Sequence, residues 1–409
     1  MKRKCIIMLA VALFLTGCSS DNEQKVVTSE HTEERNITFE KEEKKEKEEM
    51  NPETALRNLE DTLSQFEAVA NIEYAGKDRL LVITDQMYLI DIASGAILAQ
   101  VPDCNEVKGK IKVYGNDENI IIVGKEERES EDTFVFYDEN DEEQPRVLAL
   151  YYDNQLNLLK KINIFEMFAL NPFLATDVAV SMDGKLAVYD DNLNGLYLCN
   201  PETKEKEEIL CGKDEELVYD NKLQFRIGNE IAFGENDDKI IFGAACLNYP
   251  VGDGEESIPG YGSVALDGKE LYVEKAADEY NIMNAFQEFA MISQDCGFTS
   301  PTGKVMKYSF SDNKTEVIQL KSKEESNNLF SSSEGNILAA SEENGDKGWN
   351  IRFYHTDSGE LMGEQAYNAL SSESYGHPRI YVFENQNIAV LYFGSLEENG
   401  KDVLSIMQF

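Results

Sequence analysis

A short two-strand phrase recurs along the chain and constrains its fold more than any other feature. The clearest copy lies within DRLLVITDQMYLIDIASGAILAQV, Asp78–Val101, where three apolar or alternating runs are separated by turn residues. Short runs of this kind, bounded by Gly, Ser, Asp or Asn, are typical of β-strands, and a tight turn joins two of them as a hairpin. The phrase therefore predicts an antiparallel meander.

Further copies of the hairpin follow the first. Gly359 and Lys204 take the place of Gly95 in two of them, and Asn157 is expected at this turn in another. The shorter intervals between copies are about 45 residues, which is the length of a four-stranded propeller blade. Aligned on the residue four positions before the turn glycine, the six copies centre on Asp91, Asp153, Asn200, Asp267, Phe310 and His355.

The C-terminal segment supplies only part of a seventh copy. Arg379–Phe409 contains three strand-like runs and then the chain ends. A closed propeller can complete its last blade with a strand from the other end of the chain, which also removes an exposed sheet edge. Ile37–Phe39 and Val69–Tyr74 are both candidates, although the second can instead begin the first blade. The alternative to a propeller is an irregular pair of β-sandwiches.

The segment before the first blade has the pattern of a helix. Leu56, Leu59, Leu63 and Phe66 recur at steps of three and four residues, and Pro52 suits the first turn. A helix packed on the propeller is expected, with a partner-binding helix as the alternative. The fold prediction is thus an all-β chain: one propeller of seven four-stranded blades over residues 68–409, a short helix over 51–67, and a disordered N-terminal tether.

The N-terminus has the organisation of a signal segment. A basic start, MKRK, precedes the apolar run Cys5–Leu15, which is too short to cross a bilayer. The run ends in Leu15-Thr16-Gly17-Cys18, which resembles the lipobox of bacterial lipoproteins. The resemblance implies that residues 1–17 are removed and that Cys18 is diacylated, with a palmitate-type lipid, and becomes the mature N-terminus. A secretory signal without lipidation is the alternative.

Residues 18–50 are rich in charge and poor in large apolar side chains. The run EKEEKKEKEEM, Glu40–Met50, shows this most clearly. Such a segment cannot bury enough surface to offset the entropy of ordering it, so a solvated tether is expected. Two acyl chains give a stable anchor. The protein is therefore predicted to be extracytoplasmic and held to the cell membrane by the lipid on Cys18.

The blade hairpins also resemble those of quinoprotein-type, PQQ-like propellers, within the wider class of bacterial β-propeller lipoproteins. The tryptophan that ends the quinoprotein phrase is replaced by Ala99 and Gly363. The resemblance therefore implies the blade and not the quinone, and no cofactor is expected. WD40-type Gly-His and Trp-Asp signatures are absent from the sequence.

Charge excludes one class of partner. The formal net charge of the 409-residue chain is −39. A phosphate backbone is bound by clustered Lys and Arg, which this sequence lacks, so no nucleic acid is expected. The cysteines downstream of Cys18 are odd in number and irregularly spaced, which favours buried thiols over a disulfide framework; they are Cys104, Cys199, Cys211, Cys246 and Cys296.

Motifs for catalysis are not found. The three histidines occur without His-Glu-x-x-His spacing, and there is no Gly-x-Ser-x-Gly elbow. Neither a metal site nor a catalytic residue is predicted. An enzyme with carboxylates in the central channel, a hydrolase or a lyase, remains an alternative.

The insertions mark the expected contact surface. Long connections between second and third strands are predicted at Glu126–Gln144, Cys246–Gly262, Glu342–Asn350 and Ser395–Lys401, all on one rim. Loops on a rigid scaffold commonly carry function. Aromatic rings and carboxylates here offer stacking surfaces and hydrogen-bond acceptors. The predicted ligand-binding residues are Tyr249, Asp253, Glu255, Glu256, Tyr261 and Trp349.

The sequence thus favours a membrane-anchored binding or scaffolding module. Its predicted partners are the membrane, through Cys18, and an unidentified protein or carbohydrate at the rim. An accessory protein in extracellular signalling is a further alternative.

Overall fold

A computed structural model describes most of the chain from residue 51 onward. The signal segment, Cys18, the tether and the candidate strand Ile37–Phe39 lie outside it. The described residues are 51–102, 107–116, 118–126, 136–137, 143–144, 147–170, 177–190, 193–213, 215–234, 236–247, 257–276, 281–293, 303–321, 328–344 and 348–409.

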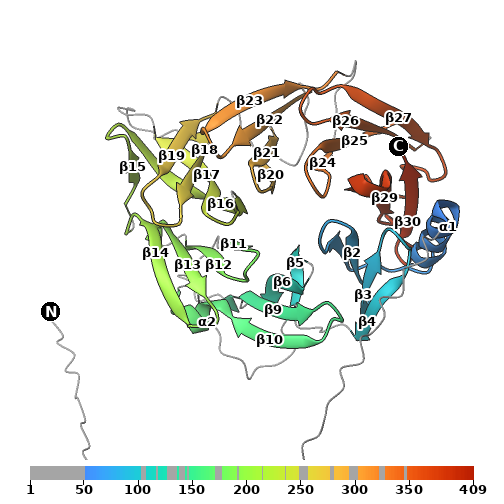
Figure 1. Cartoon of the computed structure of the whole chain (residues 1–409), viewed down its shortest axis with the longest axis horizontal. Helices are drawn as coiled ribbons and strands as arrows, with labels where there is room; N and C mark the ends of the chain where they lie inside the picture. The colour runs from blue at the N-terminus through green and yellow to red at the C-terminus, as the bar shows by residue number, and fades with distance from the viewer. Residues whose placement is uncertain are drawn as a thin grey trace, which may run out of the picture. The chain divides into compact units, whose positions relative to one another are not determined.

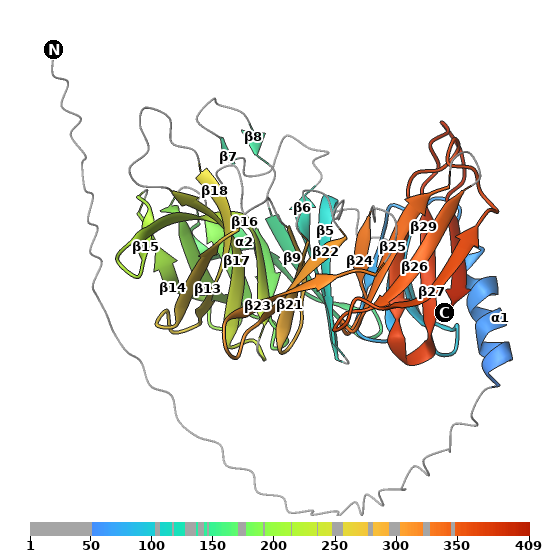
Figure 2. The ribbon, with the colours of Figure 1, turned by 90° about the horizontal axis from the view of Figure 1, so that it is seen from above.

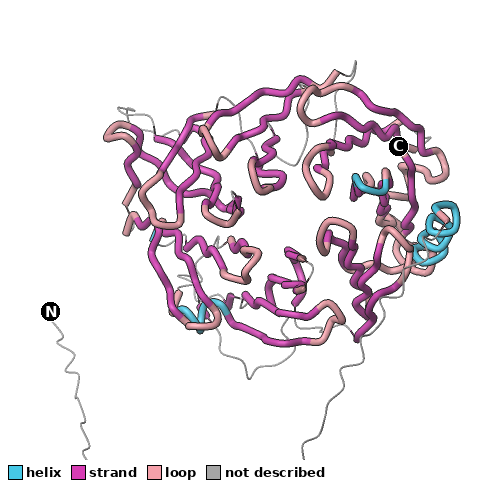
Figure 3. The backbone as a smooth tube through the Cα atoms, in the orientation of Figure 1, coloured by secondary structure: helices cyan, strands magenta, loops and turns pink. Residues whose placement is uncertain are grey.

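Seven antiparallel sheets are arranged radially around a central axis (Figure 1). The first strand of each sheet is innermost except in blade four, where β15 (Leu217–Tyr219) lies at the outside and β16 (Leu223–Gly234) is innermost. The predicted seven-bladed β-propeller is confirmed. Figure 3 shows that strands form the blades and that helical segments are few among the described residues. They are α1 (Pro52–Leu63), α2 (Ile164–Phe168) and the short helix η3 (Glu384–Gln386).

The strands group into blades in chain order. Blade one contains β1 (Asn71–Tyr74), β2 (Arg79–Ile83), β3 (Gln86–Asp91) and β4 (Ile97–Pro102). Blade two contains β5 (Val107–Gly115), β6 (Asn119–Glu126), β9 (Val147–Asp153) and β10 (Leu158–Asn163). Blade three contains β11 (Val178–Val180), β12 (Leu186–Asp190), β13 (Gly195–Asn200) and β14 (Glu205–Cys211). Blade four contains β15 (Leu217–Tyr219), β16 (Leu223–Gly234), β17 (Lys239–Leu247), β18 (Ser257–Ala265) and β19 (Leu271–Lys275). Blade five contains β20 (Asn281–Ala285), β21 (Phe289–Ser293), β22 (Lys304–Ser309) and β23 (Lys314–Gln319). Blade six contains β24 (Leu329–Ser331), β25 (Ile337–Glu343), β26 (Trp349–His355) and β27 (Leu361–Tyr367). Blade seven contains β28 (Arg379–Phe383), β29 (Ile388–Phe393) and β30 (Val403–Gln408). A separate pair, β7 (Phe136–Tyr137) and β8 (Glu143–Gln144), belongs to the connection within blade two.

Burial explains why the strands differ in composition. Every residue of β12 is buried, whereas most of β14 is exposed. Inner and middle strands are covered on both faces by neighbouring blades, so they read as continuous apolar runs. Outer strands lie where the blades diverge, so their side chains meet water.

The hydrophobic core is divided among the blade interfaces. Seven clusters are found in the described part of the chain, and each joins two neighbouring blades. One cluster brings Leu59, Leu63 and Phe66 of the α1 region against blades one and seven. The helix predicted from the leucine spacing is therefore confirmed as an element that packs on the propeller.

Helix α1 also explains how the propeller closes. Among the described residues, blade seven has three strands, the number predicted for the C-terminal segment, and α1 packs beside β30 at its outer edge (Figure 1). Of the two candidate closing strands, Val69–Tyr74 instead supplies β1. Among the contacts that join the two ends of the propeller, Val69 N–H donates to the Asp402 carboxylate at 2.8 Å, and Asp402 N–H donates to Glu67 O at 2.9 Å.

The outer hairpin turns follow the sequence prediction with one correction. Gly95, Gly359 and Lys204 all have positive φ, at 69°, 64° and 60°. In blade two the residue with this conformation is Leu156, at φ 57°, and not Asn157. The Asp153 carboxylate accepts hydrogen bonds from Asn157 N–H and Nδ2, which draws that side chain into the turn and leaves Leu156 in the left-handed conformation.

The cysteines that the structure describes are free thiols. Cys199 and Cys246 are buried and Cys211 is partly exposed. Burial raises the pKa of Cys199 to about 12 and that of Cys246 to about 11. Both thiols are therefore protonated and unreactive at neutral pH.

Candidate functional site

The central channel holds a cavity to which all seven blades contribute. Its volume is about 800 Å³, and its lining comes from β1, β5, β16, β20, β24 and β28 and from Asp177, just before β11. Lining residues lie at or before the start of the inner strand in blades one, three, six and seven, as Asn71, Asp177 and Arg379 do, and farther along the longer inner strands β5 and β16. Antiparallel pairing places the connections between second and third strands on this same side. We call it the insertion face, and the opposite side the turn face.

Two charged residues of the cavity are joined across blades two and three. Lys112 Nζ lies 2.5 Å from Asp177 Oδ1. The same carboxylate accepts hydrogen bonds from Val178 N–H at 3.0 Å and from Ile231 N–H at 2.9 Å. Asp177 therefore links blades two, three and four, and its charge is compensated by Lys112 and by these donors.

Glu230 has a similar structural role between blades four and five. Its Oε2 atom accepts a hydrogen bond from Ile282 N–H at 2.7 Å. Carboxylates that accept backbone N–H groups in this way tie one inner strand to the next.

Glu73 on β1 is different. Its side chain lines the cavity and is half-buried, and the structure gives its carboxylate no hydrogen bond and no ion pair with any described residue. Burial raises the pKa of Glu73 from 4.5 to about 7, and the positive charge of Arg379, which also lines the cavity, only partly opposes this. A carboxyl group that titrates near neutrality has thus been placed in the channel.

Three tyrosines of the cavity lie near enough to Glu73 for its charge to act on them, and each donates its hydroxyl proton to a backbone carbonyl. Tyr114 donates to Val178 O at 3.0 Å, Tyr74 donates to Ser331 O at 3.2 Å, and Tyr381 donates to Ile72 O. Burial raises the pKa of all three phenols, and the negative charge of Glu73 adds to this rise. All three line the cavity with their rings and offer it no free O–H donor; the Tyr74 oxygen also accepts from Val382 N–H at 2.6 Å, and the Tyr381 oxygen shares a hydrogen bond with Arg379.

Described residues of the insertion face form a ridge beside the cavity. The connection between blades six and seven pairs with the β29–β30 connection: Gly376 N–H donates to Gly394 O at 3.0 Å and Leu396 N–H to Ser374 O at 2.9 Å. Leu396 stands on this ridge and is 64% exposed. Figure 2 places β7 and β8 on the same side of the disc.

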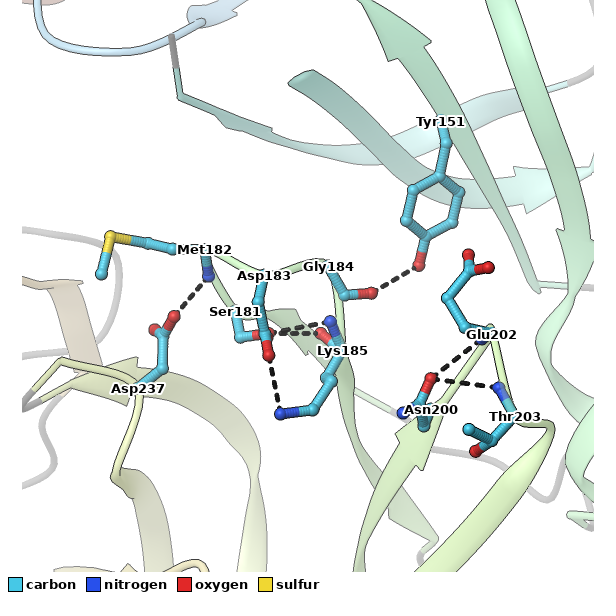
Figure 4. A network of polar contacts seen from close by, with 10 residues as sticks. All are labelled: Tyr151, Ser181, Met182, Asp183, Gly184, Lys185, Asn200, Glu202, Thr203 and Asp237. Carbon is cyan, nitrogen blue, oxygen red and sulfur yellow. Dashed lines mark hydrogen bonds and ion pairs between the residues drawn. The ribbon is translucent and has the colours of Figure 1, made fainter. Parts of the chain in front are cut away.

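On the turn face, the seven turns between first and second strands contact one another in sequence. We call these the inner turns. Between blades two and three, Asn116 Nδ2 donates to Met182 O at 2.9 Å. Between blades three and four, Met182 N–H donates to the Asp237 carboxylate, as Figure 4 shows. Within the blade-three turn, Lys185 Nζ lies 2.6 Å from the Asp183 carboxylate.

The remaining inner turns continue this series. Gln287 Nε2 donates to Asn236 Oδ1 between blades four and five, and Phe286 fills the space against Gly335 between blades five and six. Arg79 Nη2 donates to Asn116 O between blades one and two.

Blade seven contributes the strongest links of the turn face. Glu384 accepts from Asn336 N–H and from Asn336 Nδ2, both at 2.9 Å, and from Ser332 Oγ. On its other side, Gln386 Nε2 donates to Asp78 Oδ1 at 2.9 Å. The inner turns therefore form a closed belt around the axis.

Of the six ligand-binding residues predicted from the sequence, the structure describes two. Tyr249, Asp253, Glu255 and Glu256 lie outside the described residues. Tyr261 and Trp349 are described, and both are buried, at 2% and 1% exposure, so neither ring is available as an exposed contact surface.

Two of the predicted loop boundaries explain this result. Cys246–Gly262 was expected to be a loop, but β17 extends to Leu247 and β18 begins at Ser257. Tyr261 lies within β18, where its ring packs on Tyr308 with centroids 5.6 Å apart and its hydroxyl donates to Glu274 at 2.7 Å. Glycines on both sides of Tyr261 resemble loop sequence, yet a Cβ at Gly262 would lie 2.5 Å from the Phe242 ring.

Trp349 is likewise the first residue of a strand. It begins β26 and packs on Phe393 of blade seven, with ring centroids 5.0 Å apart. The isolated tryptophan therefore fills a blade interface.

The channel residues were missed by sequence reasoning. Glu73 and Arg379 stand in short inner strands whose other residues are largely apolar, and aligned blades would have shown a charge in each, whereas Lys112 lies in a strand with two further lysines. That signal is visible only once the first strand of each blade has been identified.

No known family model matches the sequence, and no curated protein matches it. Among solved structures, TolB from Acinetobacter baumannii matches with 14% identity and a TM-score of 0.34, over 82% of this chain and 78% of that one. Raptor from Chaetomium thermophilum matches with 8% identity and a TM-score of 0.46, over 84% of this chain. The matched region is only 28% of the Raptor chain.

Proposed function

We propose that this protein is a lipid-anchored extracytoplasmic binding module whose ligand is bound at the insertion face, over the mouth of the central channel. One observation carries the proposal: a cavity of about 800 Å³ is lined by residues from every blade. This volume lies in the range of small-molecule sites, which are concave and combine apolar walls with a few polar groups. The described ridge of the insertion face, which includes Leu396, lies beside the same opening.

The anchor is proposed from the sequence. Leu15–Cys18 follows a basic start and an apolar run, in the order that a lipoprotein signal requires. In the described part of the chain, no helix is long and apolar enough to cross a membrane. Acylation of Cys18 would hold the propeller at the membrane through residues 19–50.

An enzymatic role is the second candidate, because one channel carboxyl group has an unusual pKa. A pKa of about 7 would suit Glu73 to general acid–base chemistry at neutral pH. The other two described channel carboxylates, Asp177 and Glu230, accept hydrogen bonds from backbone N–H groups of the next blade. Binding is therefore the function that the geometry supports better.

The anchor is tested with the full chain produced in a bacterial host. Cys18→Ser should abolish labelling by an alkyne-tagged fatty acid and release the protein from the membrane fraction. Cys5→Ser is the matched control, because it changes a cysteine of the signal segment outside the lipobox. Equal labelling of both variants would contradict the anchor.

The binding face is tested with the fragment 51–409, which contains the whole propeller and α1. Ligands captured from a cell-envelope extract are identified, and their direct binding is then measured. We expect Leu396→Glu, on the insertion face, to weaken binding at least about tenfold. Val317→Glu is the matched control, because Val317 is an apolar residue of the outer strand β23 that is 52% exposed. Equal binding by the two variants would contradict the assignment of this face.

A further inference from the structure

Glu73 is the channel carboxylate whose bonding capacity is unused. Asp177 is compensated by Lys112 and by two backbone N–H groups, and Glu230 accepts from the next blade. Glu73 has no such partner among the described residues, although it faces the cavity. A half-buried carboxylate that lacks donors gains more from a bound cation than one that is already paired.

The surroundings of Glu73 suit a positive group better than a neutral donor. Tyr74, Tyr114 and Tyr381 have committed their hydroxyl protons to backbone carbonyls. Because the Tyr74 oxygen accepts from Val382 N–H and the Tyr381 oxygen is bonded to Arg379, their remaining contribution to the cavity is their aromatic rings and, at Tyr114, the hydroxyl oxygen. Both attract cations, and aromatic residues around a carboxylate are a recognised environment for organic ammonium groups.

A metal ion fits the same residues less well. Hard cations such as Ca²⁺ take six to eight oxygen ligands, several of them carboxylates. Within the described residues, no group of three or more His, Cys, Asp and Glu side chains is placed to hold a metal. Glu73 is a single carboxylate among phenols, so an alkylammonium is the better match.

Arg379 is a second charged residue that a ligand in the cavity could contact. It lies on β28, is exposed and lines the cavity, and its guanidinium shares a hydrogen bond with the Tyr381 hydroxyl, while the described residues provide no carboxylate within 4 Å of it. Its charge acts on Glu73 through space. A ligand with both an ammonium and a carboxylate would place one charge at each of these residues.

We propose that the insertion-side channel binds a small ligand through a protonated amine, with Glu73 as its counter-ion, the rings of Tyr74, Tyr114 and Tyr381 around it, and Arg379 facing the ligand's anionic group. This inference rests on the proposed binding function and specifies its ligand class: amine-bearing zwitterions such as amino acids and short peptides. A cavity of about 800 Å³ accommodates several residues of such a ligand.

The proposal has a pH dependence with a definite sign. A proton and an ammonium compete for Glu73, so binding weakens as the pH falls below about 7. The other charged or titratable groups that line the cavity are Lys112 and Tyr114 on β5, Asp177 before β11, Glu230 on β16, Tyr74 on β1, and His377, Arg379 and Tyr381 in and before β28. For a site dominated by Glu73, the dissociation constant should rise up to about tenfold for each pH unit below its pKa.

The test uses the fragment 51–409 and ligand-observed NMR with three probes: glycylglycine, 1,4-diaminobutane and sodium acetate. We expect glycylglycine to bind best, diaminobutane to bind and acetate not to bind. Glu73→Gln should reduce binding of both amines at least about tenfold, because it removes the charge at constant shape. Glu373→Gln is the matched control, since Glu373 is an exposed carboxylate outside the cavity.

Tyr114→Phe provides a second variant, since it keeps the ring and removes the oxygen. It should weaken diaminobutane binding by a few-fold and leave acetate unaffected. Preferential binding of acetate, binding that Glu73→Gln does not change, or the failure of both amines to bind the wild-type fragment below about 1 mM would overturn the proposal. Binding of the captured envelope ligand, measured on the same Glu73→Gln fragment, separates the two claims: if it persists, the amine site is refuted while the binding function stands.

Discussion

The two ends of the central channel use their polar residues differently. On the turn face, the inner turns bond to one another from blade to blade, and Glu384 alone accepts three hydrogen bonds. On the insertion side, Glu73 accepts none from the described residues, and the tyrosines beside it donate to backbone carbonyls. The difference separates polar groups that hold the blades together from groups left available to a ligand.

This distinction is one of bonding and not of position, because both kinds of residue occur in the cavity. Asp177 lines the same cavity as Glu73 yet connects three blades. Among the substitutions that we consider, removal of the Asp177 carboxylate should cause the largest loss of stability.

Asp177→Ala should destabilise the fragment 51–409 by about 3 kcal/mol, because it leaves the Lys112 ammonium and Ile231 N–H without their acceptor in a partly buried site. Urea-induced unfolding measures the change. Asp177→Asn, which keeps an acceptor and loses the charge, should cost less. A loss below about 1 kcal/mol for the alanine variant would mean that Asp177, like Glu73, does not hold the blades together and is left available to a ligand.

Glu384→Ala removes the acceptor of three hydrogen bonds between blades six and seven. We expect a loss of about 2 kcal/mol, somewhat less than for Asp177, because part of this carboxylate is in contact with water. Glu373→Ala, at an exposed carboxylate, is the control and should change the free energy of unfolding by less than about 0.5 kcal/mol. Equal effects of the two substitutions would show that the turn-face belt contributes little.

The blades could be predicted from sequence because they depend on local patterns. The hairpin phrase around Gly95 and Gly359 contains its own turn residue, and both glycines adopt the positive φ that such a turn needs. The helix before blade one was recognised in the same way, since Leu59 and Leu63 share one face and are buried. These elements are specified by residues a few positions apart.

The site could not be predicted because its residues converge from distant blades. Glu73 and Arg379 meet at one cavity from opposite ends of the propeller, and no spacing in the chain indicates this. The exposure of Tyr261 and Trp349 was inferred from apparent loops, but the sheets extend through these positions and bury both rings between blades. Turn-like composition in a long strand is therefore a weak guide to exposure.

Glu73→Gln should change the free energy of unfolding in the opposite direction to Asp177→Ala and Glu384→Ala, because it should stabilise the protein. Burial raises the pKa of Glu73 from 4.5 to about 7, so the folded protein binds a proton that the unfolded chain has already released between these values. The wild type should therefore lose stability as the pH rises from 4.5 to 7, and the contribution should be constant above pH 7.

The glutamine variant lacks this titration. At about pH 8 it should be more stable than the wild type by about 1–2 kcal/mol, with water in the channel limiting the gain, and near pH 4.5 the two should be similar. Unfolding by urea at both pH values measures the difference, and other carboxylates cancel in the comparison. A variant that is less stable than the wild type at pH 8 would show that Glu73 has a structural partner.

Gln287→Ala tests the weakest link of the turn-face belt, and we expect the smallest effect. Gln287 is exposed, and its amide donates only to Asn236. A single exposed hydrogen bond between neutral groups contributes little because water replaces it, so the loss should stay below about 0.5 kcal/mol. Differential scanning calorimetry measures the shift, and Gln65→Ala, at an exposed glutamine whose amide donates to Thr62 O within its own segment, is the control. A loss several times larger than that of the control would mean that the inner turns act cooperatively, so that opening one link weakens the others. The two ends of the channel would then differ not only in which groups are paired but also in whether the pairs depend on one another.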